Sequence, residues 1–217
     1  MKKIFLSLLG MPLLLMTVGC GNSTPKVPFD NGDSLEIVNR DPSIYGICGI
    51  GTSMNSLQLI DDTGDTLIID ITAAREANQV FGGLQVGDRM VVMPGETDNE
   101  AAIVINQSTL LGNWIMPNPL DGSDELGVCI KEGGVAESIA QSTLIYHTWR
   151  LTRGQLEFVV VREGGSEEEE TELFTLMKLT ADSLVFRDSE EIFEYSRQRP
   201  KEEYGSDVEI EHEEFTF

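Results

Sequence analysis

Side chains that could transfer protons near neutral pH are few in this chain, which has 217 residues and only two histidines, His147 and His212. The sequence contains no G-x-S-x-G nucleophile motif, no glycine-rich phosphate-binding loop and no H-E-x-x-H metalloprotease motif. Carboxylates would therefore have to supply any general acid–base catalysis. The chain has 37 Asp and Glu residues, and their spacing does not identify any two of them as a catalytic pair. We predict that the protein is not an enzyme and has neither catalytic residues nor a cofactor.

His212 lies within a run of acidic residues over 209–214, for which a carboxylate–imidazole metal site is one interpretation. The spacing matches no established metal-binding motif, and the charge is typical of a solvated acidic tail, which we place at residues 201–217. We therefore predict no metal site. The tail also contains apolar side chains that would let it pair with a sheet edge, namely Val208, Ile210, Phe215 and Phe217.

The three cysteines, Cys20, Cys48 and Cys129, are far apart in the sequence, so no C-x-x-C metal or redox motif exists. Cys48 and Cys129 fall in apolar β-runs of the two halves of the chain. A disulfide between them would have to cross the domain boundary that we place near residue 107. Two buried thiols are the other interpretation.

The first twenty residues have the pattern of an export signal, because two lysines precede a short apolar stretch over residues 4–18. The segment from Thr17 to Cys20 resembles the lipobox of bacterial lipoprotein signals, with Thr17 in place of the usual Leu. The resemblance implies that residues 1–19 are a signal peptide, that the Cys20 sulfur carries a diacylglycerol and that the new amino terminus is acylated. Several acyl chains form a firm membrane anchor. A plain secretory signal with an incidental cysteine is the alternative.

Residues 20–32 are rich in Gly, Ser, Thr, Asn and Pro, which predicts a flexible tether. The lipoprotein resemblance implies a location in the cell envelope, anchored by lipid in the outer membrane. No acidic cluster follows Cys20. Since such clusters resemble surface-export signals in gut-type Bacteroidetes, their absence favours the periplasmic face.

The formal net charge is −22, from 15 basic and 37 acidic residues. A surface of this sign repels phosphate backbones, so we predict no nucleic-acid partner. Apolar residues make up 41% of the chain, which is enough for a core and excludes wholesale disorder.

Short β-like runs and one helix fill the first half of the chain. The predicted strands are Ile44–Ile50, Ser56–Ile60, Thr66–Ile71, Arg89–Met93 and Ala101–Asn106. Between the third and fourth strands we predict a helix over Thr72–Phe81, N-capped by Thr72 and ended by the two glycines that follow. Three strands, a helix and two strands is the order of an OB-like five-stranded barrel, which we place at residues 33–107. This range has few basic and aromatic residues, which favours a structural or protein-contacting role.

The second half begins with Gly112-x-Trp114, a pattern that resembles the first strand of lipocalins, where the Trp plugs one end of the barrel. Together with later runs, the pattern resembles the small lipocalin-like domains of Bacteroidetes envelope lipoproteins over residues 108–199. The runs are Gly133–Ile139, Ser142–Trp149, Leu179–Phe186 and Tyr195–Arg197. The family carries no settled activity. The resemblance implies a lipocalin-like β-barrel, which we place at residues 108–200.

The predicted fold class is therefore all-β, with an OB-like barrel followed by a lipocalin-like barrel. This pairing in one chain also resembles the NlpE-type envelope stress sensors, with the domain order reversed. The candidates for ligand binding in the second barrel are Trp114, Tyr146, His147 and Trp149.

Alternation along the strand places His147 on the face of Ile145, Trp149 and Leu151. His147 would then be either a polar group inside a ligand cavity or a hydrogen-bonded histidine in a β-core. The two tryptophans would either line a cavity or fill it.

Two functions follow from these predictions. In the first, the lipid-anchored barrel binds a small apolar ligand or a lipid, in a cavity with His147 or Trp149 in its wall. In the second, the chain is an envelope sensor or protein-interaction module that presents its acidic surface to another envelope protein. A barrel filled by its own side chains would count against the first function.

Overall fold

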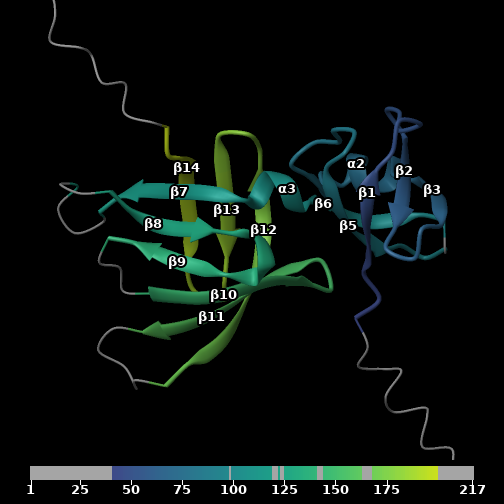
Figure 1. Cartoon of the computed structure of the whole chain (residues 1–217). Helices are drawn as coiled ribbons and strands as arrows, with labels where there is room; N and C mark the ends of the chain where they lie inside the picture. The colour runs from purple at the N-terminus through teal and green to yellow at the C-terminus, as the bar shows by residue number, and fades with distance from the viewer. Residues whose placement is uncertain are drawn as a thin grey trace, which may run out of the picture. The chain divides into compact units, whose positions relative to one another are not determined.

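The computed structural model describes residues 41–97, 99–118, 122, 125–140, 144–162 and 168–199. These residues form two β-sheets with short helices beside them, so the predicted all-β class is confirmed (Figure 1). The predicted signal peptide at 1–19, the tether at 20–32 with Cys20, and the tail at 201–217 with His212 lie outside the described residues.

The first sheet has six strands in the order β3-β2-β1-β5-β6-β4. Their bounds are β1 (Ile44–Cys48), β2 (Ser56–Asp61), β3 (Thr66–Asp70), β4 (Val80–Phe81), β5 (Arg89–Pro94) and β6 (Ala101–Asn106). The five predicted strands are confirmed, with small differences at their ends. β1, β2 and β3 form an antiparallel meander, β5 pairs with β1, and β6 pairs with β5. An isolated parallel bridge joins Asp70 to Glu100.

The helix predicted over Thr72–Phe81 is wrong in its extent and in its cap. The observed helix, α2 (Thr72–Glu76), has Ile71 as its N-cap residue, without a side-chain cap. Asn78 has a φ of 57°, a left-handed conformation that an α-helix cannot continue through. The residues that follow form β4, which pairs with β6 in parallel orientation. The alanines near residue 75 favour a longer helix. The end of the segment is instead a strand, because it pairs with β6.

The second sheet has eight strands in the order β10-β11-β12-β13-β14-β7-β8-β9 and follows helix α3 (Gln107–Leu110). The bounds are β7 (Gly112–Pro117), β8 (Glu125–Ile130), β9 (Ala136–Ile139), β10 (Leu144–Thr152), β11 (Gln155–Arg162), β12 (Glu170–Leu179), β13 (Ser183–Arg187) and β14 (Ile192–Arg197), with a 3₁₀ turn, η1 (Glu132–Gly134), before β9.

This sheet curls into a nearly closed barrel. An isolated bridge between Val135 and Thr148 joins the β9 side of the sheet to β10. The Ser138 hydroxyl also accepts a hydrogen bond from the Tyr146 N–H at 2.9 Å and donates one to the Leu144 carbonyl at 3.1 Å. Because neighbouring strands are antiparallel, the β10–β11 and β12–β13 turns lie at the end near α3. The β13–β14 turn lies at the opposite end, which we call the open end.

Burial alternates along the barrel strands, as in a sheet with one face on a core. In β11, for example, Leu156, Phe158 and Val160 are each 0% exposed. The larger buried cluster contains these residues together with Phe81 and Val91 of the first sheet, and a second cluster lies within the first sheet. The two sheets belong to one compact unit. The domain division near residue 107 stays a prediction.

Candidate functional site

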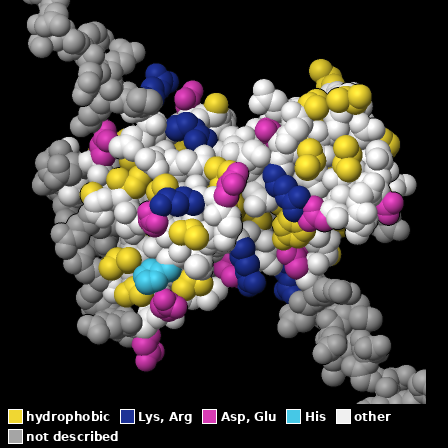
Figure 2. Space-filling view, viewed as in Figure 1, with side chains coloured by type: hydrophobic (Ala, Val, Ile, Leu, Met, Phe, Trp, Pro, Cys, Tyr) yellow, Lys and Arg dark blue, Asp and Glu magenta, His cyan; other side chains and the backbone are white. Residues whose placement is uncertain are grey.

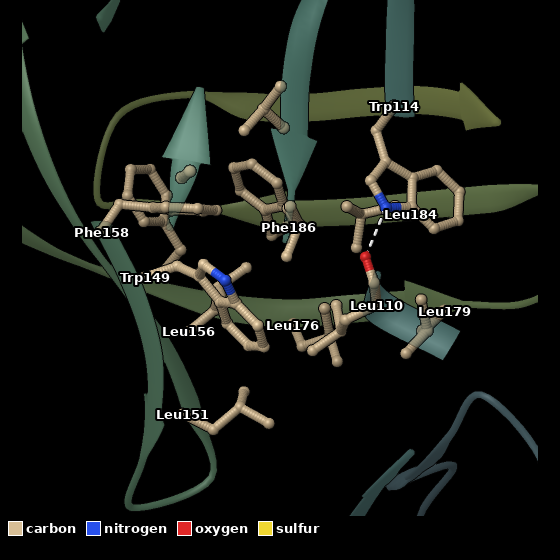
Figure 3. Close-up of a cluster of buried hydrophobic side chains, with 14 of the residues drawn as sticks. Leu110, Trp114, Trp149, Leu151, Leu156, Phe158, Leu176, Leu179, Leu184 and Phe186 are labelled. Atoms are coloured by element: carbon tan, nitrogen blue, oxygen red, sulfur yellow. Dashed lines mark hydrogen bonds between the residues drawn. The ribbon is translucent and has the colours of Figure 1, made fainter. Parts of the chain in front are cut away.

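The barrel interior is occupied by aromatic side chains from successive strands. Phe158, Phe174 and Phe186 are each 0% exposed. The Phe158 ring meets that of Tyr146 at a centroid distance of 4.8 Å, and those of Phe174 and Phe186 at 5.8 Å each. Figure 3 shows Phe158 and Phe186 among the leucines of the same cluster. Such edge-to-face and tilted contacts fill the space that a ligand would need in this part of the barrel.

Trp114 closes the barrel at the end near α3. Its side chain is 0% exposed, and its indole Nε1–H donates to the Leu110 carbonyl at 2.7 Å, the dashed line in Figure 3. The Arg197 guanidinium lies 4.1 Å from the centroid of the indole ring, in cation–π geometry. Trp114 is therefore part of the packed core and does not line an open cavity.

Arg197 ties this end of the barrel together. Its Nη1 and Nη2 donate to the carbonyls of Leu111 and Thr109 at 2.8 and 2.7 Å, and its Nε donates to the Ala181 carbonyl. Burial lowers the pKa of Arg197. Gly112 has a φ of 124°, and a Cβ there would lie 2.5 Å from Arg197 Nη1. Glycine is thus needed because the guanidinium occupies the place of a side chain.

Tyr146 is buried inside the barrel and is 3% exposed. Its hydroxyl lies 3.2 Å from that of Tyr195, so each phenol has a partner in the apolar interior. Burial raises the pKa of Tyr146 well above its usual range, and the neighbouring Tyr195 adds to the effect. Both hydroxyls therefore stay protonated at neutral pH.

Trp149 also lies in the buried cluster, where Figure 3 shows its labelled side chain beside Leu156. It is 4% exposed. Its indole Nε1–H donates to the Lys131 carbonyl at 2.8 Å. The structure thus brings Trp114, Tyr146 and Trp149 to the inner face of one barrel, and each has a hydrogen-bond partner of its own.

The predicted placement of His147 on the face of Trp149 is wrong. The register of β10 shifts between Tyr146 and Thr148, which lie opposite the consecutive residues Val160 and Val159. His147 is the extra residue of this β-bulge, so the alternation of faces is displaced by one residue. Its side chain is 41% exposed and its Nδ1 lies 3.1 Å from a Glu169 carboxylate oxygen. His147 is therefore neither in a barrel cavity nor in the core.

A hollow of about 560 Å³ lies at the open end of the barrel. Arg162 and Glu172 occupy inward positions at the ends of β11 and β12, and they form a bidentate ion pair with both N···O distances at 2.9 Å. Asp188 lies 3.9 Å from the same guanidinium. Hydrogen bonds from the backbone N–H groups of Glu191 and Glu190 lower the pKa of Asp188, so this carboxylate is ionised at neutral pH.

Sequence reasoning missed this hollow. Arg162 and Glu172 stand at strand ends, where charged residues are usually solvated, and they share a site only through the pairing of β11 with β12. The available signal was the alternation in β11, which continues through Leu156, Phe158 and Val160 to Arg162. Charged residues hence face inward where the barrel opens.

Cys48 and Cys129 both carry free thiols, of which the first is buried and the second half-buried. Within the described part of the chain, no three His, Cys, Asp or Glu side chains lie close enough together to hold a metal ion. Of the helices described, none has both the length and the apolar character needed to cross a membrane.

Residues 106–198 match the model of a family described as lipocalin-like. A lipocalin-like protein from Bacteroides thetaiotaomicron VPI-5482, for which a crystal structure exists, has 30% sequence identity to this chain. The similarity covers 42% of this chain and 97% of that protein, with a TM-score of 0.37. No curated protein matches the chain. The match to the family model supports the predicted lipocalin-like assignment for residues 106–198.

Proposed function

Since residues 106–198 belong to the lipocalin-like family, we propose that this chain is a lipid-anchored, non-catalytic envelope protein whose barrel binds a small molecule at its open end. The observation that carries the proposal is the hollow of about 560 Å³ above the Arg162–Glu172 ion pair. Its volume is within the range of small-molecule sites, about 300–1,000 Å³. The ion pair fixes both side chains, so the floor of the site is formed before a ligand arrives.

The lining of the hollow favours a ligand with a basic group. Among the described lining residues there is one basic side chain, Arg162, and there are four acidic ones. Leu173, 49% exposed, supplies an apolar contact at the rim. The aromatic cluster below occupies the depth that a lipid tail would need, so a small amine suits this site better than the wholly apolar ligand expected from the sequence. The acidic lining residues are Glu172, Asp188, Glu190 and Glu191.

Titration with tryptamine, an aromatic amine, tests this site in the purified full-length chain by calorimetry. We expect saturable binding that Asp188→Asn weakens about tenfold, the loss of one close charge pair. Asp182→Asn, in the turn at the opposite end of the barrel, is the matched control and should bind as the parent does. Equal binding by both variants, or none by the parent together with no co-purified small molecule in native mass spectrometry, would contradict the proposal.

Lipid anchoring is proposed on the resemblance of residues 17–20 to a lipobox. The test is expression of the full chain in a bacterium that processes lipoproteins, followed by membrane fractionation. We expect the parent in the membrane fraction and Cys20→Ser in the soluble fraction, with an acyl mass on the first mature residue of the parent only. A chain that stays membrane-bound after Cys20→Ser is not held by this sulfur.

For the first sheet we propose an OB-like barrel with a structural or protein-contacting role. The strand pairing supports it: β1, β2 and β3 form a meander, α2 follows β3, and β5 pairs with both β1 and β6. The parallel bridge from Asp70 to Glu100 adds a link between the third strand and the start of the last. The likeness to NlpE-type sensors remains a prediction about domain pairing alone.

A protein-interaction function is the second candidate, and exposed apolar side chains on the first sheet favour it. Ile47 and Ile60 are cross-strand partners, 42% and 41% exposed. In the β1–β2 loop, Ile50 is 88% exposed and Met54 is 78% exposed. Figure 2 shows hydrophobic side chains gathered over this part of the molecule. Such a patch is typical of a contact surface for another protein.

Chemical cross-linking in intact membranes tests this second candidate. The double variant Ile50→Ser, Met54→Ser should lose a partner that the parent captures. Ile192→Ser, 61% exposed at the barrel's open end, is the matched control and should retain it. If the double variant captures the same protein as the parent, the patch is not the contact surface.

A further inference from the structure

A second hollow, of about 320 Å³, lies where β1 and β5 of the first sheet meet α3 and β10. It shares no described lining residue with the hollow at the open end. The elements around it are joined directly, since the Tyr45 hydroxyl donates to the Leu151 carbonyl at 2.8 Å. The two sheets also share the larger buried cluster and form one compact unit. The walls of this hollow are therefore held in place by packing on both sides.

The charged side chains in the described lining of the second hollow are basic, and each is paired with a carboxylate outside that lining. Among its described lining residues are two arginines, Arg89 and Arg150, and no carboxylate. Each guanidinium is oriented by a bidentate ion pair just outside the lining: Arg89 binds Asp62 through Nη1 and Nη2, and Arg150 binds Glu157 through Nε and Nη2. A guanidinium has five N–H donors, and these pairs use two of them. Within the described part of the chain, the other three donors of each arginine make no hydrogen bond and can meet a bound acceptor.

Gln107 supplies the complementary group. Its side-chain Oε1 is buried and has no hydrogen-bond partner among the described residues, although it lines the hollow. Buried polar atoms are almost always hydrogen-bonded, so we expect this oxygen to accept a hydrogen bond from a bound molecule or from water. The residue is fixed at the start of α3, where Asn106 Oδ1 accepts from the Thr109 N–H at 3.0 Å.

The remaining wall is apolar and aromatic. Trp149 and Leu151 come from β10, and Tyr45 comes from β1. A flat or apolar part of a ligand would pack on these side chains while its polar ends meet the arginines and the glutamine.

We propose that this hollow binds a small carboxylate-bearing molecule with an apolar or aromatic body and a hydroxyl or N–H group. Arg89 and Arg150 donate hydrogen bonds to the carboxylate, and Gln107 Oε1 accepts one from the hydroxyl or N–H group. Tyr45, Trp149 and Leu151 contact the body of the molecule. This site is independent of the amine site proposed at the open end.

The test uses 4-hydroxybenzoate as the probe, because it carries a carboxylate, a ring and a hydroxyl donor. The readout is the ¹H–¹⁵N NMR spectrum of the full-length chain, which has two tryptophans. We expect the indole signal of Trp149 and the side-chain amide signal of Gln107 to shift saturably. The indole signal of Trp114, which is not in the lining, should not move. The methyl ester of the probe, which lacks the charge, should bind at least tenfold more weakly.

Variants assign the contacts. Arg150→Gln should weaken binding of 4-hydroxybenzoate at least tenfold. Arg89→Gln removes the other guanidinium and should also weaken binding. Gln107→Leu should weaken binding of 4-hydroxybenzoate but leave binding of benzoate, which has no hydroxyl, nearly unchanged. Arg187→Gln, which changes an exposed arginine of β13 outside both described linings, is the control and should bind as the parent does. An unshifted Trp114 signal shows that each variant is folded.

Three results would overturn the proposal: no saturable shift at Trp149, equal binding of the acid and its methyl ester, or loss of binding in Arg187→Gln with retention in Arg150→Gln. None of these depends on tryptamine binding at the open end. Failure of one site is therefore distinguishable from failure of the other.

Discussion

Truncation of Phe158 tests directly whether the barrel interior is filled. The side chain is 0% exposed, and its ring contacts those of Tyr146, Phe174 and Phe186. Burial of an aromatic side chain removes about 150–250 Å² from water, which at about 25 cal/mol per Å² amounts to about 4–6 kcal/mol. Partial relaxation around the new cavity brings the usual cost of Phe→Ala to about 3–5 kcal/mol. We expect Phe158→Ala to lower the free energy of unfolding by that amount.

Urea denaturation followed by tryptophan fluorescence measures this loss. Both tryptophans of the chain, Trp114 and Trp149, are buried in the same barrel and report on its unfolding. Met177→Ala on β12 is the control, since this side chain is 49% exposed and its removal should cost less than about 1 kcal/mol. A loss for Phe158→Ala as small as that of the control would mean that the ring borders empty space. The filled interior, and the exclusion of a deep apolar ligand, would then be refuted.

Two further changes test the closed end and the buried phenols. Gly112→Ala and Gly64→Ala both place a side chain on a backbone with positive φ, 124° and 93°, which should cost about 1–3 kcal/mol of unfolding free energy each. Only at Gly112 does the new Cβ also meet Arg197, so Gly112→Ala should cost more than Gly64→Ala, which has no atom within 4 Å. Equal losses would remove the steric role given to Arg197. Burial raises the pKa of Tyr195 to about 12, above its unfolded value near 10. The unfolded state therefore releases this proton first, so the contribution of Tyr195 to stability is constant below about pH 10 and falls as the pH rises toward 12. Tyr195→Phe should reduce that fall by about 1 kcal/mol at pH 11, measured as unfolding free energies at pH 8 and pH 11, and an unchanged fall would contradict the assignment.

Local residue patterns were enough to predict the strands of the first sheet. Runs of Ile, Val and Leu between polar turns favour extended structure, and such runs ended close to the observed ends of β1 and β6. Gly112 and Trp114 were likewise recognisable, through the resemblance of the Gly-x-Trp pattern to the first strand of lipocalins. What these predictions share is that neighbours in sequence determine them.

The position of His147 depends on residues far along the chain. Within β10, nothing in the sequence marks the bulge, because the register against β11 creates it by placing Tyr146 and Thr148 opposite consecutive residues. One inserted residue reverses the face of everything after it. Alternation therefore predicted the inward Trp149 but assigned its neighbour His147 to the same face. The site at the open end was missed for the same reason, because only strand pairing brings Arg162 to Glu172.

The fold alone does not decide what this barrel binds. Eight strands enclose an interior just wide enough either to be filled by side chains or to hold one small ligand, and side-chain volume determines which. Here β11, β12 and β13 each place a phenylalanine in the interior, at Phe158, Phe174 and Phe186. Because these rings fill the interior, the space for a ligand is in the two surface hollows. The described linings of the two hollows carry side chains of opposite charge. An amine and a carboxylate probe should thus separate two sites that family membership cannot distinguish.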